Sequence, residues 1–326
     1  MTMGSFWRGK RVCITGIAGF VGAHLARRLV DLGASVMGVD VREKSPCLSA
    51  HRLNSIVHPD IDLEDVWDIE SLLFGNRVHV LFHLAGVSHI RYAQERPIEA
   101  WRTNIHTTEA VLEACRLSRE KPEAVVVASS NHIIGPQASW PANESAPLNQ
   151  RDVYGASKIC ADIITQCYGQ TLGVPAVALR HVNCYGPADP HGGHIVTHCT
   201  LACLKGAPPV LRNEGTARKA YLYIDDVVDA YLLLAERAQD LRGRSFWAAG
   251  EPVSVYDLAS AAMRAAGMAG SPKIEVTDLD QTDYFEHLDD SALRGLGWAP
   301  KVSLDEGLRR TAQWYKEHGG MAWATS

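Results

Sequence analysis

Strand-like runs alternate with helix-length segments through the first half of the chain, and this alternation constrains the fold more than any other feature. The runs are RVCIT, ASVMGV, HVLFHLA, AVVVAS and AVALR, and helical stretches separate them. Such an alternation predicts a parallel sheet with helices on both faces. We therefore expect an α/β protein in which residues 1–180 form a doubly wound parallel sheet.

The rhythm loosens after residue 180. Short apolar runs at 209–211, 221–224 and 246–248 alternate there with helices expected near 226–238, 254–266 and 303–318. We expect a smaller C-terminal substrate-binding lobe made of residues 181–213 and 251–326, with residues 214–250 woven back into the first domain. Open α/β sheets bind ligands at the carboxyl ends of their strands, so the cleft between the two parts should open there.

The first strand-like run leads directly into TGIAGFVG and then into a helix, AHLARRLVDLG. This stretch supplies five candidate cofactor contacts: Gly16, Gly19, Phe20, Val21 and Gly22. The first glycine permits a tight turn, the second lets the backbone approach a pyrophosphate, and the third lets the helix pack closely on the strand. The diphosphate would lie at the positive end of the helix. Because the pattern follows a strand and opens a helix, it predicts a Rossmann-type dinucleotide site.

A second strand ends at Asp40, roughly twenty residues after the glycines. Its carboxylate can accept hydrogen bonds from the adenosine ribose and would repel a 2′-phosphate. Arg42 follows two residues later and opposes this preference only slightly. We therefore predict NAD, rather than NADP, as the cofactor.

The helix expected to begin near residue 152 carries YGASK, which places Tyr154 and Lys158 on one face. A fixed ammonium and an oxidised nicotinamide would both favour the phenolate, so we expect Tyr154 to act as a base at neutral pH. Ser130, at the end of a strand-like run, can hydrogen-bond the substrate oxygen from which Tyr154 would take a proton. A tyrosine and a lysine at this spacing often occur by chance. After a dinucleotide fingerprint and a Ser-Ser pair, they indicate a catalytic site.

These motifs together resemble the extended short-chain dehydrogenase/reductase family of nucleotide-sugar epimerases and dehydratases. The matching segments are TGIAGFVG, HLAG, YGASK, RHVNCYGP, the region PPVLRNEGTARKAYLYIDDVVDAYLLLAE, and LGWAP, which together cover nearly the whole chain. The resemblance implies an enzyme of carbohydrate metabolism that keeps NAD bound and takes a hydride from a sugar hydroxyl. The smaller lobe would bind the nucleotide sugar.

The resemblance also implies cofactor contacts outside the glycine stretch. By motif position, Asp68 and Ile69 would contact the adenine. Leu84 and Ala85, with Lys158, would contact the ribose and the nicotinamide side.

Substrate contacts follow from the same resemblance. Asn183 would hold the diphosphate of the substrate, together with either Arg218 or Lys219, since relatives carry Arg-Asp where this chain has Lys-Ala. Ser88 and Arg91 would lie near the edge of the substrate. The position of Arg91 is similar to that in uronate 4-epimerases and hints at an acidic sugar, although a surface arginine is the simpler interpretation.

Asn131 and His132 bear on the reaction. Hexose 4,6-dehydratases of this family carry an acid directly after the catalytic Ser or Thr, and Asn131 stands there in this chain. A carboxamide cannot donate an acidic proton to a leaving hydroxide. His132 could do so near pH 7, but alone it makes an unusual dehydratase. We therefore expect a nucleotide-sugar 4-epimerase, an isomerase, in which both residues hold the sugar. A packed histidine beside the strand end is the structural alternative for His132.

Three other functions are weighed against epimerisation. FWRGKRV and VLRN resemble the CDP-glucose dehydratase branch, which makes a 4,6-dehydratase the second choice. Ser-Ser-Asn-His resembles uronate dehydrogenases, but these lack a second lobe. A non-catalytic NAD-binding protein is disfavoured because Ser130, Tyr154 and Lys158 are all present.

Composition excludes other classes of partner. The net charge of −5 gives no electrostatic reason to expect nucleic acid or an anionic membrane. No apolar run has the length of a membrane span, and the N-terminus lacks the apolar stretch of a signal peptide. Eight cysteines without CxxC pairing indicate buried free thiols, and hence the cytoplasm. The resemblance implies a homodimer through the helices near 97–118 and 152–172, although the apolar faces of these helices could equally belong to the core.

A histidine- and cysteine-rich stretch could suggest a metal. Its candidate ligands are His191, His194, His198, Cys199 and Cys203. The HGGH spacing fits no common metal site, and the segment falls where relatives wrap the nucleotide and the sugar. We therefore expect no metal.

Overall fold

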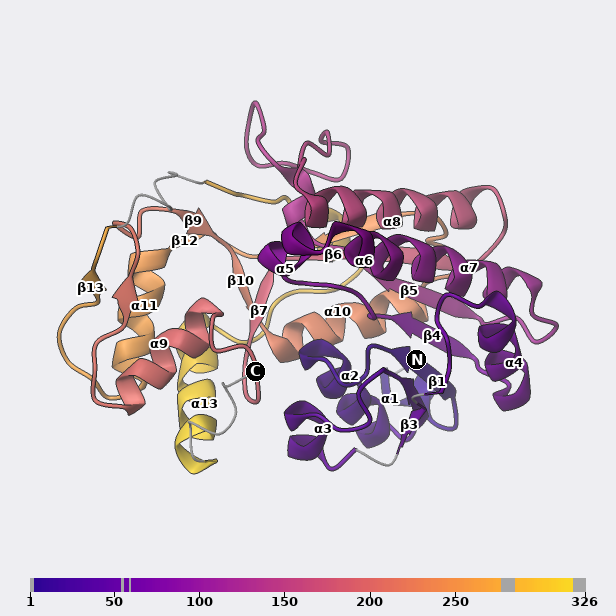
Figure 1. The fold of residues 1–326 in the computed structure, drawn as a ribbon, viewed down its shortest axis with the longest axis horizontal. Coiled ribbons are helices and arrows are strands. Elements are labelled where there is room, and N and C mark those ends of the chain that lie inside the picture. Colours follow the sequence, from indigo (N-terminus) through magenta and orange to yellow (C-terminus); the bar gives the residue numbers. More distant parts are fainter. Residues whose placement is uncertain (1–2, 54–55, 59, 277–284, 319–326) are drawn as a thin grey trace.

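A seven-stranded, wholly parallel sheet forms the larger part of the molecule (Figure 1). The computed structural model describes residues 3–53, 56–58, 60–276 and 285–318. The strand order is β11-β6-β5-β4-β1-β2-β3. The strands are β1 (Arg11–Thr15), β2 (Ser35–Val39), β3 (Val57–His58), β4 (Val80–His83), β5 (Ala124–Ala128), β6 (Ala176–His181) and β11 (Ser245–Ala248). Order and direction are those of a Rossmann-type doubly wound sheet, so the predicted fold class is confirmed.

Helices cover both faces of this sheet, because successive strand residues point to opposite sides. On one face lie α2 (Phe20–Asp31), α3 (Pro46–His51) and α10 (Ile224–Glu236); on the other lie α4 (Val66–Asn76), α7 (Thr107–Leu117) and α8 (Val153–Gln170). In β5, Val126 packs into the first core, whereas Val125 and Val127 pack into the second. The short helix α1 (Met3–Trp7) buries Trp7 in the first core.

Shorter elements complete the chain. Between β4 and α7 come α5 (Ile90–Glu95), α6 (Pro97–Trp101) and a π-helical turn (Arg102–His106), and a 3₁₀ turn (Asn131–Ile134) follows β5. The smaller lobe contains α9 (Ile195–Leu204), α11 (Val255–Ala265), α12 (Ser291–Arg294) and α13 (Leu304–Glu317). Three short strand pairs connect its segments: β7 (Asn183–Tyr185) with β10 (Tyr221–Tyr223), β9 (Arg218–Lys219) with β12 (Val253–Ser254), and β8 (Val210–Leu211) with β13 (Lys273–Ile274).

The five strand-like runs of the sequence are strands of the large sheet, as predicted. The two-residue β3 has no comparable signal, because a strand so short shows no alternation. In the segment predicted to return to the first domain, β11 pairs with β6 and α10 packs against β5 and β6. The domain boundaries themselves stay a prediction, and residues 277–284 and 319–326 of the smaller lobe lie outside the described residues.

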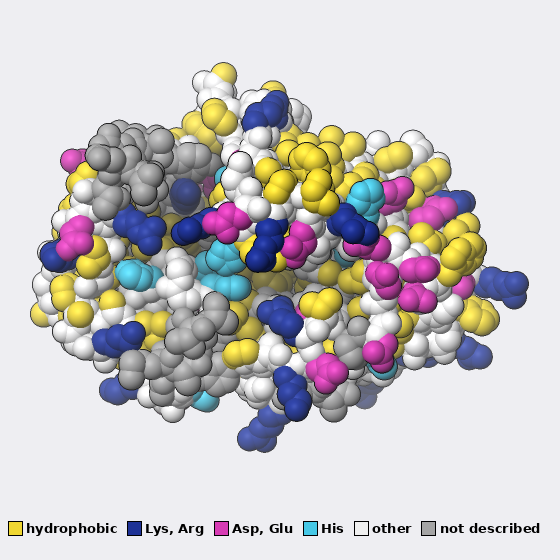
Figure 2. Space-filling view, in the orientation of Figure 1, with side chains coloured by type: hydrophobic (Ala, Val, Ile, Leu, Met, Phe, Trp, Pro, Cys, Tyr) yellow, Lys and Arg dark blue, Asp and Glu magenta, His cyan; other side chains and the backbone are white. Residues whose placement is uncertain are grey.

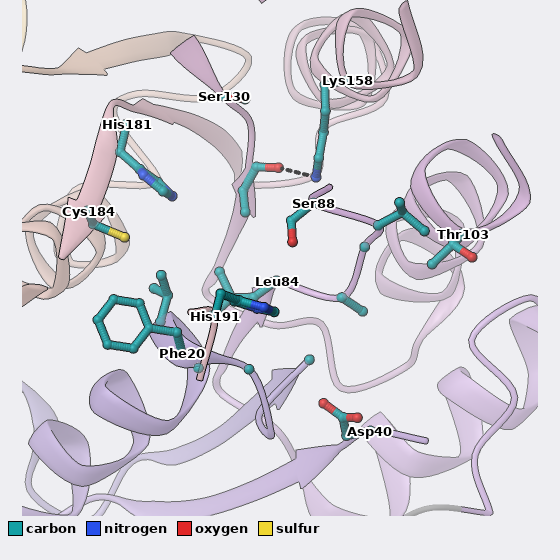
Figure 3. A pocket seen from close by; sticks show the side chains of 18 of the residues that line it. Phe20, Asp40, Leu84, Ser88, Thr103, Ser130, Lys158, His181, Cys184 and His191 are labelled. Atoms are coloured by element: carbon teal, nitrogen blue, oxygen red, sulfur yellow. Dashed lines mark hydrogen bonds between the residues drawn. The ribbon is translucent and has the colours of Figure 1, made fainter. Parts of the chain in front are cut away.

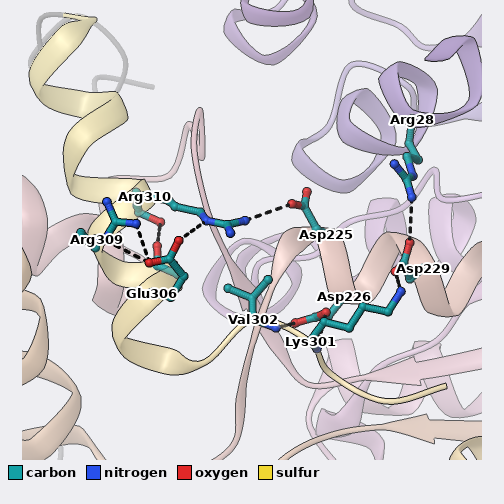
Figure 4. Close-up of polar contacts among 11 residues, drawn as sticks. Arg28, Asp225, Asp226, Asp229, Lys301, Val302, Glu306, Arg309 and Arg310 are labelled. Carbon is teal, nitrogen blue, oxygen red and sulfur yellow. Dashed lines mark hydrogen bonds and ion pairs between the residues drawn. The ribbon is translucent and has the colours of Figure 1, made fainter.

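A polar network holds the smaller lobe against the sheet domain (Figure 4). The carboxylate of Asp226 on α10 accepts hydrogen bonds from the backbone N–H groups of Lys301 and Val302, at 2.8 and 3.2 Å. Asp229, one turn later, pairs with the ammonium of Lys301 at 2.5 Å and with Arg28 of α2 at 3.7 Å. These contacts join α2, α10 and the segment before α13, and so hold these three parts of the chain together.

The cysteines depart partly from expectation. Cys13 and Cys115 are buried free thiols, as predicted, but Cys160 and Cys167 are exposed. They lie on the outer side of α8, since the opposite side of this helix packs on the sheet. Among the described residues, no helix combines the length and the apolar character that crossing a membrane requires.

Candidate active site

A cavity of about 1160 Å³ lies at the carboxyl ends of the strands, between the sheet domain and the smaller lobe. In the space-filling view the surface is hollowed there, with histidine side chains at one end of the hollow (Figure 2). Pockets for single small ligands usually measure about 300–1,000 Å³. The cavity therefore has room for a dinucleotide and a second ligand.

The glycine stretch forms one wall of the cavity, and all five residues predicted there line it. Gly16 has a φ of 72°, and a Cβ on it would lie 2.6 Å from the backbone nitrogen of Ala85. A Cβ on Gly22 would lie 2.4 Å from the carbonyl oxygen of Gly16. Gly19 caps the N-terminus of α2 without a side-chain hydrogen bond. The backbone thus forms a cradle that side chains would fill, at a helix N-terminus that favours a diphosphate.

Asp40 follows β2 and is buried at the cavity wall. Its carboxylate accepts hydrogen bonds from the backbone N–H of Ala18 at 2.9 Å and of Arg42 at 3.0 Å. Each carboxylate oxygen can accept more than one bond, so ribose hydroxyls can still be bound. Leu84 and Ala85 also line the cavity. This set fits NAD.

The predicted adenine contacts are wrong. Ile69 is fully buried in the core between α4 and the sheet, and Asp68 lies in the first turn of α4; neither lines the cavity. The cavity wall is instead formed by residues 60–64, directly after β3. The sequence here has several Asp-apolar pairs in succession, and the two pairs nearest the strand end, Asp60-Ile61 and Asp62-Leu63, are the ones that line the cavity.

Ser130, Tyr154 and Lys158 all line the cavity. Asp152 caps α8 by accepting the N–H of Gly155 at 2.9 Å, so the helix starts just before Tyr154. The ammonium of Lys158 donates to the carbonyl oxygen of Ala128, at the end of β5, at 3.1 Å (Figure 3). These contacts bring the carboxyl end of β5 and the N-terminal part of α8 together at the cavity.

The pKa values differ from expectation. Burial raises the pKa of the Tyr154 phenol, and a hydrogen bond with Ser130 opposes this rise only in part. Burial lowers the pKa of Lys158 to about 8, while Asp162 raises it. The ammonium of Lys158 donates to the carbonyl oxygen of Ala128. The chain without its cofactor therefore does not lower the pKa of Tyr154 as expected.

Asn131 lines the cavity beside Ser130 and carries an unexpected partner. Its amide nitrogen donates to both carboxylate oxygens of Glu286, at 2.8 and 3.1 Å. Glu286 comes from the smaller lobe, is only 1% exposed, and donates its own N–H to the carbonyl of Arg218. No sequence signal indicated Glu286, because 155 residues separate it from Asn131.

His132, in contrast, does not line the cavity, so the structure gives no support to the prediction that it holds the sugar. Its Nε2 lies 2.6 Å from a carboxylate oxygen of Asp152, and its ring lies 5.6 Å from that of Tyr154. The 3₁₀ turn after Ser130 directs consecutive side chains to different sides. His132 therefore braces the start of α8, close to the packed histidine considered as the alternative.

The other substrate candidates divide in the same way. Ser88, Asn183 and Lys219 line the cavity. Arg218 does not; its guanidinium donates to the carbonyl of Pro252 at 3.0 Å, since neighbouring residues of a strand point to opposite sides. Arg91 does not line it either, because its side chain is 91% exposed and pairs with Glu95 on the same helix. Of the two alternatives for the diphosphate, Lys219 lies at the cavity and Arg218 does not, and the exposure of Arg91 agrees with the interpretation of a surface arginine.

The histidine-rich stretch also reaches the cavity. His191 and His194 line it, and the buried carboxylate of Asp189 accepts a hydrogen bond from His194 at 2.8 Å. Within the described ranges, no three side chains of His, Cys, Asp or Glu come together in a way that could hold a metal ion. His181 and Tyr221 line the cavity as well; both lie in segments that match the family, but nothing within those segments distinguished them as site residues.

Comparison with known proteins places these features in context. Residues 12–249 match the model of the NAD dependent epimerase/dehydratase family. The chain is 29% identical to UDP-glucose 4-epimerase of Mycolicibacterium smegmatis, covering 94% of this chain and 98% of that protein. It is 26% identical to a trifunctional UDP-glucose 4,6-dehydratase/UDP-4-keto-6-deoxy-D-glucose 3,5-epimerase/UDP-4-keto-L-rhamnose-reductase of Arabidopsis thaliana, with 96% of this chain aligned to 48% of that protein. The chain thus spans about half the length of this plant relative.

A solved structure is similar over the same range. The UDP-glucose 4-epimerase of Thermotoga maritima with UDP-glucose superposes with a TM-score of 0.84 at 26% identity, covering 94% of this chain and 99% of that one.

Proposed function

This chain belongs to the NAD-dependent epimerase/dehydratase family, and from the geometry of its site we propose that it is a nucleotide-sugar 4-epimerase. NAD, held by the glycine stretch and Asp40, would supply hydride chemistry at C4 of the sugar: removal of the hydride to give a ketone, and its return to the other face. The protein supplies the cradle for the dinucleotide, the groups that move the proton of the C4 hydroxyl, and a lobe that holds the nucleotide sugar.

The proton is handled by the cluster at the ends of β5 and α8. Tyr154 takes the proton of the C4 hydroxyl and gives it back, while Ser130 hydrogen-bonds the same oxygen. Lys158 holds the ribose of the cofactor, and its positive charge favours the phenolate. Burial raises the pKa of the phenol, so the positive charges near it must lower this pKa again before Tyr154 can take the proton.

The substrate diphosphate is assigned to Asn183 and Lys219, both of which line the cavity on the side of the smaller lobe. Lys219 contributes a point charge and lacks the bidentate fork of an arginine.

The observation that carries the choice of an epimerase is the pair formed by Asn131 and Glu286. A dehydratase needs an acid beside the catalytic serine, and this position holds an amide whose nitrogen donates to a buried carboxylate. His132, the other possible acid, lies outside the cavity wall. Oxidation at C4 without an acid for the departing hydroxide leads back to an alcohol, and return of the hydride to the opposite face of the ketone makes the reaction an epimerisation.

A panel of nucleotide sugars, incubated with the NAD-loaded protein, tests this proposal by mass spectrometry and chromatography of the products. We expect an isomer of unchanged mass. A product lighter by one water would replace the epimerase with a dehydratase, and no reaction of any sugar would leave only a binding function.

A 4,6-dehydratase is the second candidate. The observation that favours it is the carboxyl of Glu286, which is hydrogen-bonded to Asn131 of the cavity wall. A shift of Asn131 would bring this acid to the sugar.

A further inference from the structure

The orientation of the Asn131 amide is fixed by chemistry. A carboxylate only accepts hydrogen bonds, so the group that faces both oxygens of Glu286 must be the NH₂ of the amide. The carbonyl oxygen is then the polar atom that Asn131 has left for the cavity. Among the described residues no donor is bonded to it, and Asn131 forms part of the cavity wall beside Ser130.

Glu286 also sets the charge behind this wall. Glu286 is only 1% exposed, and its backbone N–H donates to the carbonyl of Arg218. The residues that follow it, 287–289, pair with the backbone of Ala142. Tyr221 lines the cavity close by; burial raises its pKa, and the negative charge of Glu286 raises it further. The field of Glu286 is therefore felt at the cavity surface.

From this geometry we infer that Glu286 acts through Asn131 to select the sugar: the subsite beside Ser130 accepts a hydrogen bond from a sugar hydroxyl and rejects a carboxylate. The inference rests on the proposed function and names its substrate class, a nucleoside diphosphate joined to a neutral hexose. A hexuronate would place a carboxylate against an acceptor oxygen backed by a buried charge, and like charges at such distances cost several kcal/mol. Arg91, which could have favoured an acidic sugar, lies outside the cavity wall.

The experiment compares kcat/KM for the glucose and the glucuronate forms of UDP, dTDP and CDP, so that nucleotide and sugar preferences are measured separately. We expect the wild type to favour glucose at least about 100-fold. Glu286→Gln removes the negative charge. The new amide can donate a hydrogen bond to the carbonyl oxygen of Asn131, which allows the Asn131 amide to turn around. We expect the preference to fall at least about tenfold, with the glucuronate rate rising. Glu251→Gln, an exposed acid of the same lobe, is the matched control.

Other results would overturn the inference. They are a wild type without sugar preference, or a Glu286→Gln variant that loses activity equally on both sugars, as a merely structural role predicts. If this variant does not fold, Asn131→Ser serves in its place. It should lose activity on glucose about tenfold and still reject glucuronate, and acceptance of glucuronate would contradict the inference.

Failure of the proposed function gives a different result. If the wild type prefers glucose but forms a dehydrated product, the proposed epimerase function is contradicted, while the inference about the choice of sugar stands. A wild type that turns over none of the six substrates removes both.

Discussion

The cofactor side of the cavity and its substrate side are built differently. Gly16, Gly22 and Asp40 follow directly from the ends of β1 and β2, within one strand-helix-strand unit. On the substrate side, Asn131 follows β5, Lys219 belongs to β9, and Glu286 precedes α12. One side is local in the sequence, and the other is assembled from three distant segments.

This difference explains where the sequence motifs succeeded. A strand end, a turn and a helix start form a unit whose geometry is nearly independent of the rest of the fold. The substrate side depends on how the smaller lobe docks, through contacts such as Asp226 with the segment at Lys301. If Glu286 selects the sugar as we propose, we expect specificity to change through Glu286 while the chemistry proposed for Tyr154 stays the same.

Tyr154→Phe should reduce the reaction rate more than any other substitution considered, because it removes the proposed catalytic base, which lies between the cofactor side and the substrate side. We expect the rate to fall about 10²–10⁴-fold, while NAD binding changes little. Turnover and calorimetric NAD affinity are the measurements. Tyr168→Phe, on the same helix but bonded to Glu113, is the control. If Tyr154→Phe kept more than about a tenth of the wild-type rate, the assignment of the base would be contradicted.

Asp40 should decide the choice of cofactor without affecting the substrate side. We expect NAD to bind about 100-fold more tightly than NADP, because a buried carboxylate opposes a 2′-phosphate. Asp40→Asn should bring the ratio below about 10, measured by calorimetry. Asp31→Asn, an exposed acid of α2, should leave it unchanged. Comparable NADP affinity in the wild type would sink this prediction.

The sheet domain should be sensitive to acid through His83. This buried ring lies 2.8 Å from the hydroxyl of Thr15, and burial lowers its pKa from 6.5 to about 3. Below about pH 6.5 the unfolded chain binds a proton at His83 that the folded chain does not bind. The free energy of unfolding therefore decreases as the pH is lowered from 6.5 toward the folded pKa of about 3. We expect a loss of about 2 kcal/mol between pH 6.5 and 5 from this group.

Denaturant unfolding at the two pH values measures this loss. His83→Gln should flatten the dependence, whereas His106→Gln, an exposed histidine, should not. An unchanged slope in His83→Gln would show that the ring does not carry the effect.

His132→Ala should affect catalysis rather than sugar binding, since His132 braces Asp152 at the start of α8. We expect kcat to fall about tenfold, with KM within about twofold of the wild type. His106→Ala is again the control. An accumulation of reduced nicotinamide confined to this variant, seen by absorbance, would instead make His132 the acid of a dehydration.

Arg91→Ala should have the smallest effect, below about twofold on either sugar, because an exposed ion pair contributes little. Steady-state kinetics with UDP-glucose and UDP-glucuronate measures it. A selective loss of activity on glucuronate would show that Arg91 reaches the substrate, and would weaken the division between the two sides.

The sequence by itself determined the parallel sheet, the glycine cradle, Asp40, and the positions of Ser130, Tyr154 and Lys158 in one cavity. These features depend on local periodicity and on strand ends that a parallel sheet gathers at one edge. Even there, several similar Asp-apolar pairs follow one another, and the sequence could not show that residues 60–64 rather than Asp68 line the cavity, because the two-residue β3 carries no signal.

Only the tertiary structure decided which neighbours of Ser130 face the substrate. Asn131 turns into the cavity and His132 out of it because a 3₁₀ turn follows β5. The partner of Asn131, Glu286, comes from a segment 155 residues away. Local patterns carry no information about such a pair, since its contact exists only after two separate parts of the chain have packed together.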